Sequence, residues 1–316
     1  MRQGREFLLL LGICVLLASS MPLTSEAFSS LPFAETQTLR IDDPGPLDDL
    51  GYSLGTGRGS LIVGAINVED TLGNDVGAAY VYRSEESGWE LDGILQPSDG
   101  QHNDAFGRAT DIYGETAIVG VPNQDALGRS SGAAYIFGKG ETEEWRELAK
   151  LVAPDGEKGE LFGLSVSMGN QYAAIGAFRH DDSPAPGVPM EKGAVYIFQE
   201  NAPLNWEFSS KIQPIDLSYG DHFGYRVDVF GDTLVATAPS VQYGNDQWKG
   251  AVYLFRKDGA QWAQIAKLTP DDPLANGTFG SDVSLGDGRL LLSATGPTGT
   301  RGAAYVFEET NTGQWK

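Results

Sequence analysis

One short pattern recurs five times in this chain and restricts what it can fold into. An aromatic residue or leucine followed by glycine stands at Leu50-Gly51, Phe106-Gly107, Phe162-Gly163, Phe223-Gly224 and Phe279-Gly280. The pattern glycines lie 56, 56, 61 and 56 residues apart. A fixed period of this length is typical of repeat proteins, in which one supersecondary unit is stacked many times and no unit buries its apolar face alone.

Each repeat predicts four short β-strands. After the pattern glycine, apolar residues alternate with small or polar ones, as in Val166-Ser167-Met168, which is the period-two signature of a half-buried strand. A tight turn and a more apolar second strand follow, and that strand ends in small residues, as at Gly176-Ala177. The third strand begins with Gly-Ala-(Ala/Val)-Tyr, and the fourth begins at a tryptophan 12 or 13 residues later. The small or polar positions within the first strands are Gly55, Asp111, Ser167, Asp228 and Ser284.

Four short strands per repeat, with no amphipathic helix, predict an all-β fold: a β-propeller of four-stranded blades. A sandwich of many strands would also account for the strands, but it would not explain why every repeat keeps the same register. The repeats start near residues 50, 106, 162, 223 and 279.

The ends of the chain predict how the ring closes. Each strand-four tryptophan precedes the next pattern glycine by 18 residues, and the same spacing before Gly51 lands on Phe33. Phe33–Ile41 therefore resembles a fourth strand without its first three, and the fifth repeat stops at Trp315, where a fourth strand should start. We predict five blades, the last closed by the N-terminal strand. The alternative is that the natural protein continues past Lys316 with more blades.

Residues 1–27 have the layout of a secretory signal peptide. Arg2 and Arg5 form a basic region, Phe7–Ala18 is almost wholly apolar, and Ser25-Glu26-Ala27 offers small residues for cleavage. The alternative is an N-terminal membrane anchor, although the apolar run is shorter than the roughly 20 residues that span a bilayer. We expect residues 28–316 to form a single propeller domain that is secreted or exposed at the cell surface, with no further transmembrane segment.

The net charge of −21 restricts the partners. Nucleic acids and anionic membrane surfaces are polyanions, so a strongly acidic protein is a poor partner for either. We expect the partner to be an extracellular protein or a glycan, and we expect the propeller to be a monomer.

The Phe-Gly starts and the small-residue ends of the second strands, as at Gly120-Val121-Pro122, resemble the FG-GAP repeat that builds the integrin α-chain propeller. The resemblance implies a β-propeller with an adhesion or recognition role. Integrin-type repeats often carry a calcium loop between the first and second strands, but here that connection is a short turn such as Met168–Gln171. Calcium needs about six to eight oxygen ligands. We therefore expect no cofactor and no metal site of the integrin kind, and we compare the chain with short-loop FG-GAP proteins.

Acidic residues in other loops leave two interpretations open. They could hold Ca²⁺ weakly, or they could cap turns by accepting hydrogen bonds from nearby backbone amides. These residues are Asp42, Asp43, Asp48, Asp49, Asp99, Asp104, Asp271 and Asp272. The longest loop between a second and a third strand holds His180, Asp181 and Asp182, and these are the candidate ligand-binding residues, because binding residues concentrate on loops held by a rigid scaffold.

The sequence offers no candidate catalytic residue. Cys14, the one cysteine, lies in the predicted signal peptide, and the three histidines, His102, His180 and His222, have no metal-ligand spacing. We expect an exported, non-catalytic propeller that binds its partner through loops. The alternatives are a hydrolase or lyase that acts on polysaccharide, for which a carboxylate pair would suffice, and a calcium-modulated adhesion module.

Overall fold

The computed structural model describes residues 37–40, 48–140, 143–182, 190–243, 247–259, 261–270, 278–296 and 301–316. The chain divides into two units, residues 1–39 and 40–316. Of the first unit only 37–39 are described, and they form neither helix nor strand. The predicted signal peptide lies outside the described residues. The described ranges contain no helix, and hence none that could span a membrane.

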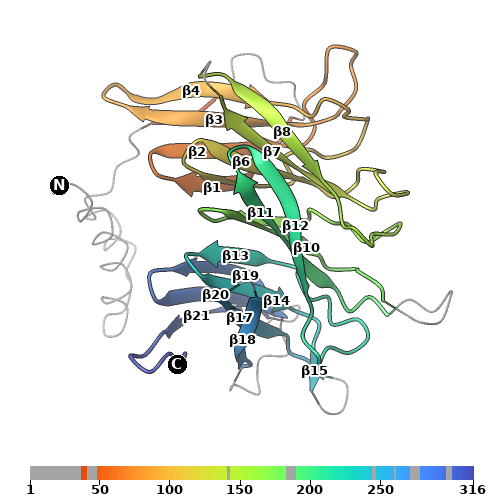
Figure 1. The fold of residues 1–316 in the computed structure, drawn as a ribbon, viewed down its shortest axis with the longest axis vertical. Coiled ribbons are helices and arrows are strands. Elements are labelled where there is room, and N and C mark those ends of the chain that lie inside the picture. Colours follow the sequence, from red (N-terminus) through yellow and green to blue (C-terminus); the bar gives the residue numbers. More distant parts are fainter. Residues whose placement is uncertain are drawn as a thin grey trace. The chain divides into compact units, whose positions relative to one another are not determined.

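Residues 40–316 form a β-propeller of five antiparallel blades that follow one another in chain order, as predicted (Figure 1). Blade 1 holds β1 (Leu50–Gly57), β2 (Ser60–Ala65), β3 (Ala78–Glu85) and β4 (Gly88–Leu95). Blade 2 holds β5 (Ala109–Tyr113), β6 (Thr116–Val121), β7 (Ala133–Lys139) and β8 (Trp145–Leu151). Blade 3 holds β9 (Ser165–Met168), β10 (Tyr172–Ala177), β11 (Ala194–Ala202) and β12 (Asn205–Ile212).

Blade 4 holds β13 (Val227–Phe230), β14 (Thr233–Ala238), β17 (Ala251–Asp258) and β18 (Gln261–Leu268), and a two-stranded ribbon of β15 (Gln242–Tyr243) and β16 (Gln247–Trp248) lies in the connection between β14 and β17. Blade 5 holds β19 (Thr278–Gly286), β20 (Arg289–Thr295) and β21 (Ala303–Glu308). Within each blade, neighbouring strands pair in sequence order, so every blade is a meander with its first strand at one edge.

The fourth strand of blade 5 differs in part from the prediction. Trp315 forms an antiparallel bridge with Glu309, and Lys316 and Glu308 exchange backbone hydrogen bonds, so these last residues begin to pair with β21. The predicted N-terminal strand, Phe33–Ile41, is not confirmed. Its described part, 37–40, is not in a strand, and the remainder lies outside the described residues.

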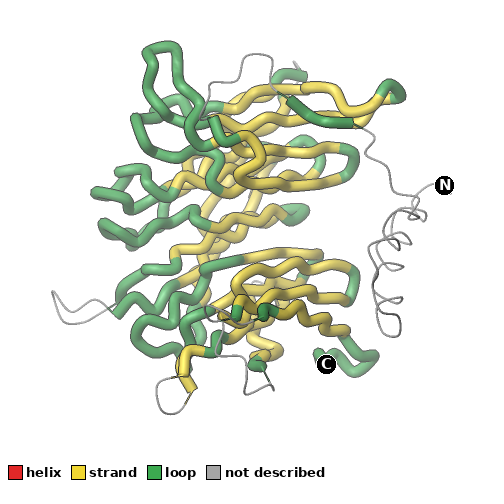
Figure 2. Tube along the Cα trace, turned by 180° about the vertical axis from the view of Figure 1, so that it is seen from behind, coloured by secondary structure: helices red, strands yellow, loops and turns green. Residues whose placement is uncertain are grey.

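The hydrophobic core lies between the blades. The second and third strands of blades 2, 3 and 4 are buried on both faces, as in β6, where Ala117–Val121 are all buried. Each apolar cluster joins two neighbouring blades; Ile118 and Ile136 of blade 2, for example, pack with Ile175 and Tyr196 of blade 3. Loops lie at both ends of the strands (Figure 2). These central strands are almost wholly apolar because a neighbouring sheet covers each of their faces.

A repeated contact, here called the blade clasp, joins each blade to the preceding one. It consists of the Phe-Gly pair that starts a blade and the third-strand glycine of the blade before it. The phenylalanine N–H donates across the blade boundary, as from Phe106 to the carbonyl oxygen of Val76 at 3.0 Å. Parallel bridges pair Gly77 with Phe106, Gly132 with Phe162 and Gly193 with Phe223. Each phenylalanine ring is fully buried against aromatic rings of the third strand in its own blade.

At three of the four blade clasps, the close approach of the two blades requires glycine where the second strand ends. The Gly224 carbonyl oxygen lies directly against the α-carbon of Gly176, so a side chain there would overlap backbone. The same oxygen accepts the Ser165 hydroxyl at 2.9 Å. Gly224 has φ +86°, a conformation that glycine adopts without steric cost. The small residues at the ends of the second strands are therefore explained by backbone contact between neighbouring sheets.

The last blade carries a face that no neighbouring blade covers. In β20 and β21, Leu291 is 50% and Val306 49% exposed, whereas the second and third strands of blades 2 to 4 are buried at nearly every position. The first strand of blade 1 is likewise uncovered, with Leu54 71% exposed. Gly51 has the φ of a pattern glycine, +95°, but an added Cβ would meet nothing within 4 Å. Four blade clasps are therefore formed among the described residues.

We predict that Gly176→Ala destabilises the fold by about 3 kcal/mol or more, because the new methyl group would overlap the backbone oxygen of Gly224 and a backbone atom cannot change rotamer. Gly286→Ala is the matched control: it also lies in a strand, and its added Cβ meets no atom within 4 Å. Urea unfolding of both variants measures the difference. If the Gly176→Ala and Gly286→Ala variants were equally stable, the close contact between Gly176 and the Gly224 carbonyl oxygen would be contradicted.

Candidate functional site

The first strands of all five blades surround a central cavity of about 880 Å³. Residues of β1, β5, β9, β13 and β19 line it, so the cavity is built from the strand that each pattern glycine introduces. Its volume lies in the range of protein sites for small molecules, about 300–1,000 Å³. This cavity is the best-formed candidate site in the described part of the chain.

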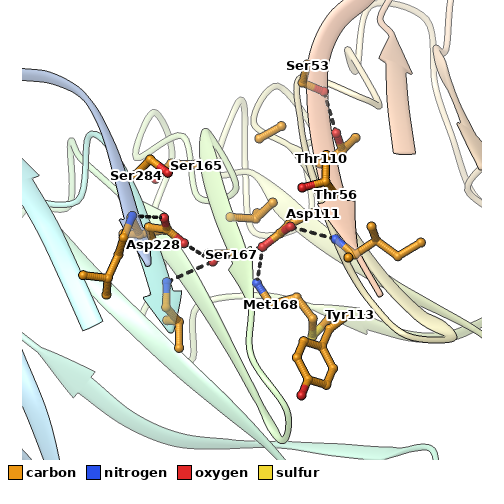
Figure 3. Close-up of a pocket in the computed structure, with 18 of the residues that line it drawn as sticks. Ser53, Thr56, Thr110, Asp111, Tyr113, Ser165, Ser167, Met168, Asp228 and Ser284 are labelled. Atoms are coloured by element: carbon orange, nitrogen blue, oxygen red, sulfur yellow. Dashed lines mark hydrogen bonds between the residues drawn. The ribbon is translucent and has the colours of Figure 1, made fainter. Parts of the chain in front are cut away.

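A row of side chains within the cavity joins one blade to the next (Figure 3). Asp111 Oδ2 of blade 2 accepts the backbone N–H of Met168 in blade 3 at 2.7 Å. Ser167 Oγ accepts the N–H of Val229 in blade 4 at 3.1 Å, and Asp228 Oδ2 accepts the N–H of Leu285 in blade 5 at 2.6 Å. The first strand is the edge of each sheet, so its outward N–H groups need acceptors from elsewhere. These side chains supply the acceptors.

Blade 1 departs from this row because Gly55 has no side chain to offer. The next N–H in the series, that of Ile112, is accepted instead by Oδ1 of Asp111 at 2.8 Å. Asp111 therefore serves two backbone amides, one in its own blade and one in blade 3. Its carboxylate is part of the frame that holds the first strands together.

Ser167 lies between the two carboxyl groups and cannot donate to both. Its hydroxyl oxygen is 3.0 Å from Asp111 Oδ2 and 3.1 Å from Asp228 Oδ1. A hydroxyl carries a single proton, so both contacts are hydrogen bonds only when one of the two acids is protonated. Burial raises the pKa of Asp111 to about 6, with the charge of Asp228 adding to it, and burial also raises the pKa of Asp228. Protonation of one acid completes the Asp–Ser–Asp chain of hydrogen bonds.

Two arginines lie where the pattern glycines open onto the cavity. The Arg108 guanidinium lies 4.6 Å above the Tyr52 ring, and that of Arg226 lies 4.8 Å above the Tyr225 ring. Arg226 Nε is also 3.4 Å from Asp282 Oδ1. Burial lowers the pKa of Arg108, and the positive charge of Arg226 lowers it further. The two cations are thus close enough to repel each other.

His180, the first candidate from the sequence, is enclosed rather than exposed. It is only 2% exposed, and its Nδ1 lies 2.9 Å from Oε1 of the equally buried Glu160. Its Nε2 faces the Lys211 ammonium group, which can only donate, so Nδ1 carries the proton and donates to Glu160. His180 therefore holds its loop in place and does not contact solvent.

The other two candidates lie at the surface end of the same loop. Asp181 Oδ1 accepts the N–H of Met190 at 2.9 Å, across residues 183–189, which lie outside the described ranges. Asp182 is exposed, with Oδ1 3.9 Å from the Lys192 Nζ. The structure places the three candidates in one loop, with His180 buried, Asp181 half-buried and Asp182 exposed.

Among the described acidic loop residues, Asp104 caps a turn, whereas Asp99 and Asp49 bind side chains. Asp99 accepts the Tyr135 hydroxyl and the Lys150 ammonium, each at 2.5 Å, and burial with this hydrogen bond raises the pKa of Tyr135. Asp104 accepts the N–H of Gln101 at 2.8 Å. Asp49 accepts the Asn67 amide at 2.9 Å. Residues 42, 43, 271 and 272 lie outside the described ranges. Across the described ranges, no group of three or more acidic, histidine or cysteine side chains has metal-binding geometry.

The sequence analysis did not identify the residues that line the cavity as candidate site residues. The residue after each pattern glycine varies, as Tyr52, Arg108, Leu164, Tyr225 and Ser281. The next position varies as widely, as Ser53, Ala109, Ser165, Arg226 and Asp282, so variation in the sequence does not single out Tyr52 and Arg108. In the sequence, Asp111 and Asp228 are recognisable only as polar residues within half-buried strands. The sequence does not show which strand forms the sheet edge that faces a cavity.

Asp111→Asn should change how stability depends on pH. A raised folded pKa means that the folded state holds its proton more tightly, so this group's contribution is present below the unfolded pKa of 3.8 and is lost as the pH rises through about 6. When the pH is lowered from 7.5 to 5, we expect the free energy of unfolding of the wild type to rise by about 1 kcal/mol relative to that of the variant, as measured by urea unfolding. The control, Asp287→Asn in an exposed turn, should show no such change. If the difference in unfolding free energy between the wild type and Asp111→Asn stayed constant over this pH range, the raised pKa of Asp111 would be contradicted.

Comparison with known proteins agrees with this architecture. The fold resembles the crystal structure of a protein from Lactobacillus plantarum with a TM-score of 0.52 and 11% sequence identity, covering 84% of this chain and 69% of that one. At this identity the likeness concerns the fold alone. A search of curated proteins found no match.

The FG-GAP repeat matches four segments, residues 89–137, 145–198, 206–255 and 262–307. Each segment begins in the fourth strand of one blade and ends in the third strand of the next. Together the segments cover more than half of the 316 residues. The chain therefore belongs to the FG-GAP repeat family.

Proposed function

We propose that this protein is an exported recognition module, secreted or held at the cell surface, that binds an extracellular protein or glycan without transforming it. The observation that carries the proposal is the role of Asp111 and Asp228. The acidic side chains deep in the cavity accept backbone N–H groups of neighbouring blades, and so they belong to the frame. A cavity of this size with its carboxylates already engaged favours binding over chemistry.

The surface distribution of variation supports recognition. The strands and blade clasps repeat with little change, whereas the connections differ in length and chemistry. The longest of them presents Asp181 and Asp182 from a base fixed by the buried His180–Glu160 contact. A rigid frame that carries diverse loops is the usual arrangement of binding proteins. FG-GAP repeats are also typical of extracellular proteins, which agrees with the signal peptide predicted for residues 1–27.

A polysaccharide hydrolase or lyase is the second candidate, and one observation favours it. Oxygens of Asp111 and Asp228 both lie near Ser167 Oγ, at 3.0 and 3.1 Å, so they are at most about 6 Å apart. That is near the separation of the two acids in retaining glycosidases. Against it, each carboxylate would have to release a backbone amide of the next blade to reach a substrate. We therefore favour the binding role.

The two candidates are separated by measuring binding and turnover on the same purified protein. We expect saturable binding to at least one member of an array of glycans and extracellular protein domains, and no cleavage of polysaccharides by reducing-end assay. Asp228→Asn serves as the control, because binding at the loops should survive it. Cleavage that is present in the wild type and absent in Asp228→Asn would replace this proposal with the enzymatic one.

A further inference from the structure

The mouth of the central cavity carries an arginine, Arg108, that has no counter-ion in the part of the chain that the structure describes. Among the described acidic residues, none forms an ion pair with Arg108, whose guanidinium is partly buried over Tyr52. Most buried or half-buried charges in proteins are paired, because removing a charge from water without a partner costs free energy. In a chain with net charge −21, an unpaired arginine at a cavity mouth is unusual.

A second arginine lies close enough to act with it. Arg226 repels Arg108 electrostatically, and its one ion pair is the 3.4 Å contact with Asp282, whose side chain is 75% exposed. An exposed ion pair of this kind contributes little free energy and is readily exchanged for another anion. Two guanidinium groups that repel each other are stabilised when an anion lies between them.

The lining below the two arginines is rich in hydroxyl groups. Residues with hydroxyl side chains line the cavity from blades 1, 2, 3 and 5; they are Ser53, Thr56, Thr110, Ser165, Ser167 and Ser284. The hydroxyls of Ser165 and Ser167 are buried and already bonded within the frame, whereas Thr56 and Ser284 are exposed. Ser53 and Thr110 are bonded to each other at 2.9 Å, which leaves lone pairs for further hydrogen bonds. Such a wall suits a ligand with many hydroxyl groups better than an apolar one. Tyr52, which is 42% exposed, adds an aromatic surface at the mouth.

We propose that the mouth of the cavity binds an acidic sugar, with the carboxylate held between Arg108 and Arg226 and the ring hydroxyls facing the serines and threonines below. This inference rests on the proposed recognition function and specifies its ligand class. The planar guanidinium of a single arginine matches a carboxylate through two parallel hydrogen bonds, so either arginine can bind the acid in this way. The overall negative charge of the protein repels polyanions elsewhere on its surface, so binding depends on this local pair.

The test is calorimetric titration of the full protein with three probes: a trimer of galacturonic acid, its methyl ester, and a short peptide of glutamates. We expect the acid trimer to bind at least tenfold more tightly than the neutral ester and the peptide, with affinity falling as salt is raised. Equal affinity for acid and ester overturns the inference, as does absence of binding. Tighter binding of the peptide replaces the sugar with a protein segment and also overturns it.

Variants assign the effect to the two arginines. Arg108→Gln and Arg226→Gln should each weaken binding of the acid trimer at least tenfold, and Arg108→Lys should recover part of the loss. Arg289→Gln is the control, since Arg289 is exposed in blade 5 and pairs with Glu308 at 3.1 Å. Thermal melting confirms that each variant is folded. Unchanged binding in folded Arg108→Gln and Arg226→Gln overturns the inference but leaves the recognition function standing, whereas polysaccharide cleavage would refute that function itself.

Discussion

The propeller depends on a close contact between a carbonyl group and an α-carbon, which is made across three of the four blade boundaries. The carbonyl oxygen of a pattern glycine lies against the glycine that ends the second strand of the preceding blade, as for Gly224 and Gly176. Backbone atoms that approach so closely fix the distance and the angle between two sheets. The buried Phe223 ring and its neighbours then fill the space that this angle leaves. At the fourth boundary Thr237 replaces the glycine, and Gly280 lies against its side chain.

The repeat in the sequence and the blade in the structure are different units. A matched segment such as 145–198 begins in β8 of blade 2 and ends in β11 of blade 3. Each repeat therefore contributes to two sheets and contains the Phe-Gly half of a blade clasp near its middle. Unfolding one repeat would remove a strand from one blade and three from the next, so neighbouring blades are expected to unfold together.

The fold was predictable because the same pattern of residue types occurs in five successive repeats. Strand positions, short turns and crowded second-strand ends all follow from residue types such as Gly176 and Phe223, whose spacing is regular. The site was harder, because it depends on which strand edges meet around the cavity. Arg108 and Arg226 are ordinary surface residues in the sequence, and only the ring arrangement brings blades 2 and 4 to the same mouth. His180 was found but assigned to the wrong environment, since a histidine in a loop gives no sign of the buried Glu160 opposite it.

The row of acceptors in the cavity has a consequence for how such proteins diversify. Gly55, Asp111, Ser167, Asp228 and Ser284 occupy one structural position but differ in chemistry, and where Gly55 has no side chain the neighbouring Asp111 takes over its hydrogen bond. The blade boundary therefore tolerates exchange at a position that lines the cavity. A duplicated repeat can keep its clasp glycines and acquire new cavity residues one at a time, so that the lining of the cavity changes while the architecture is inherited unchanged.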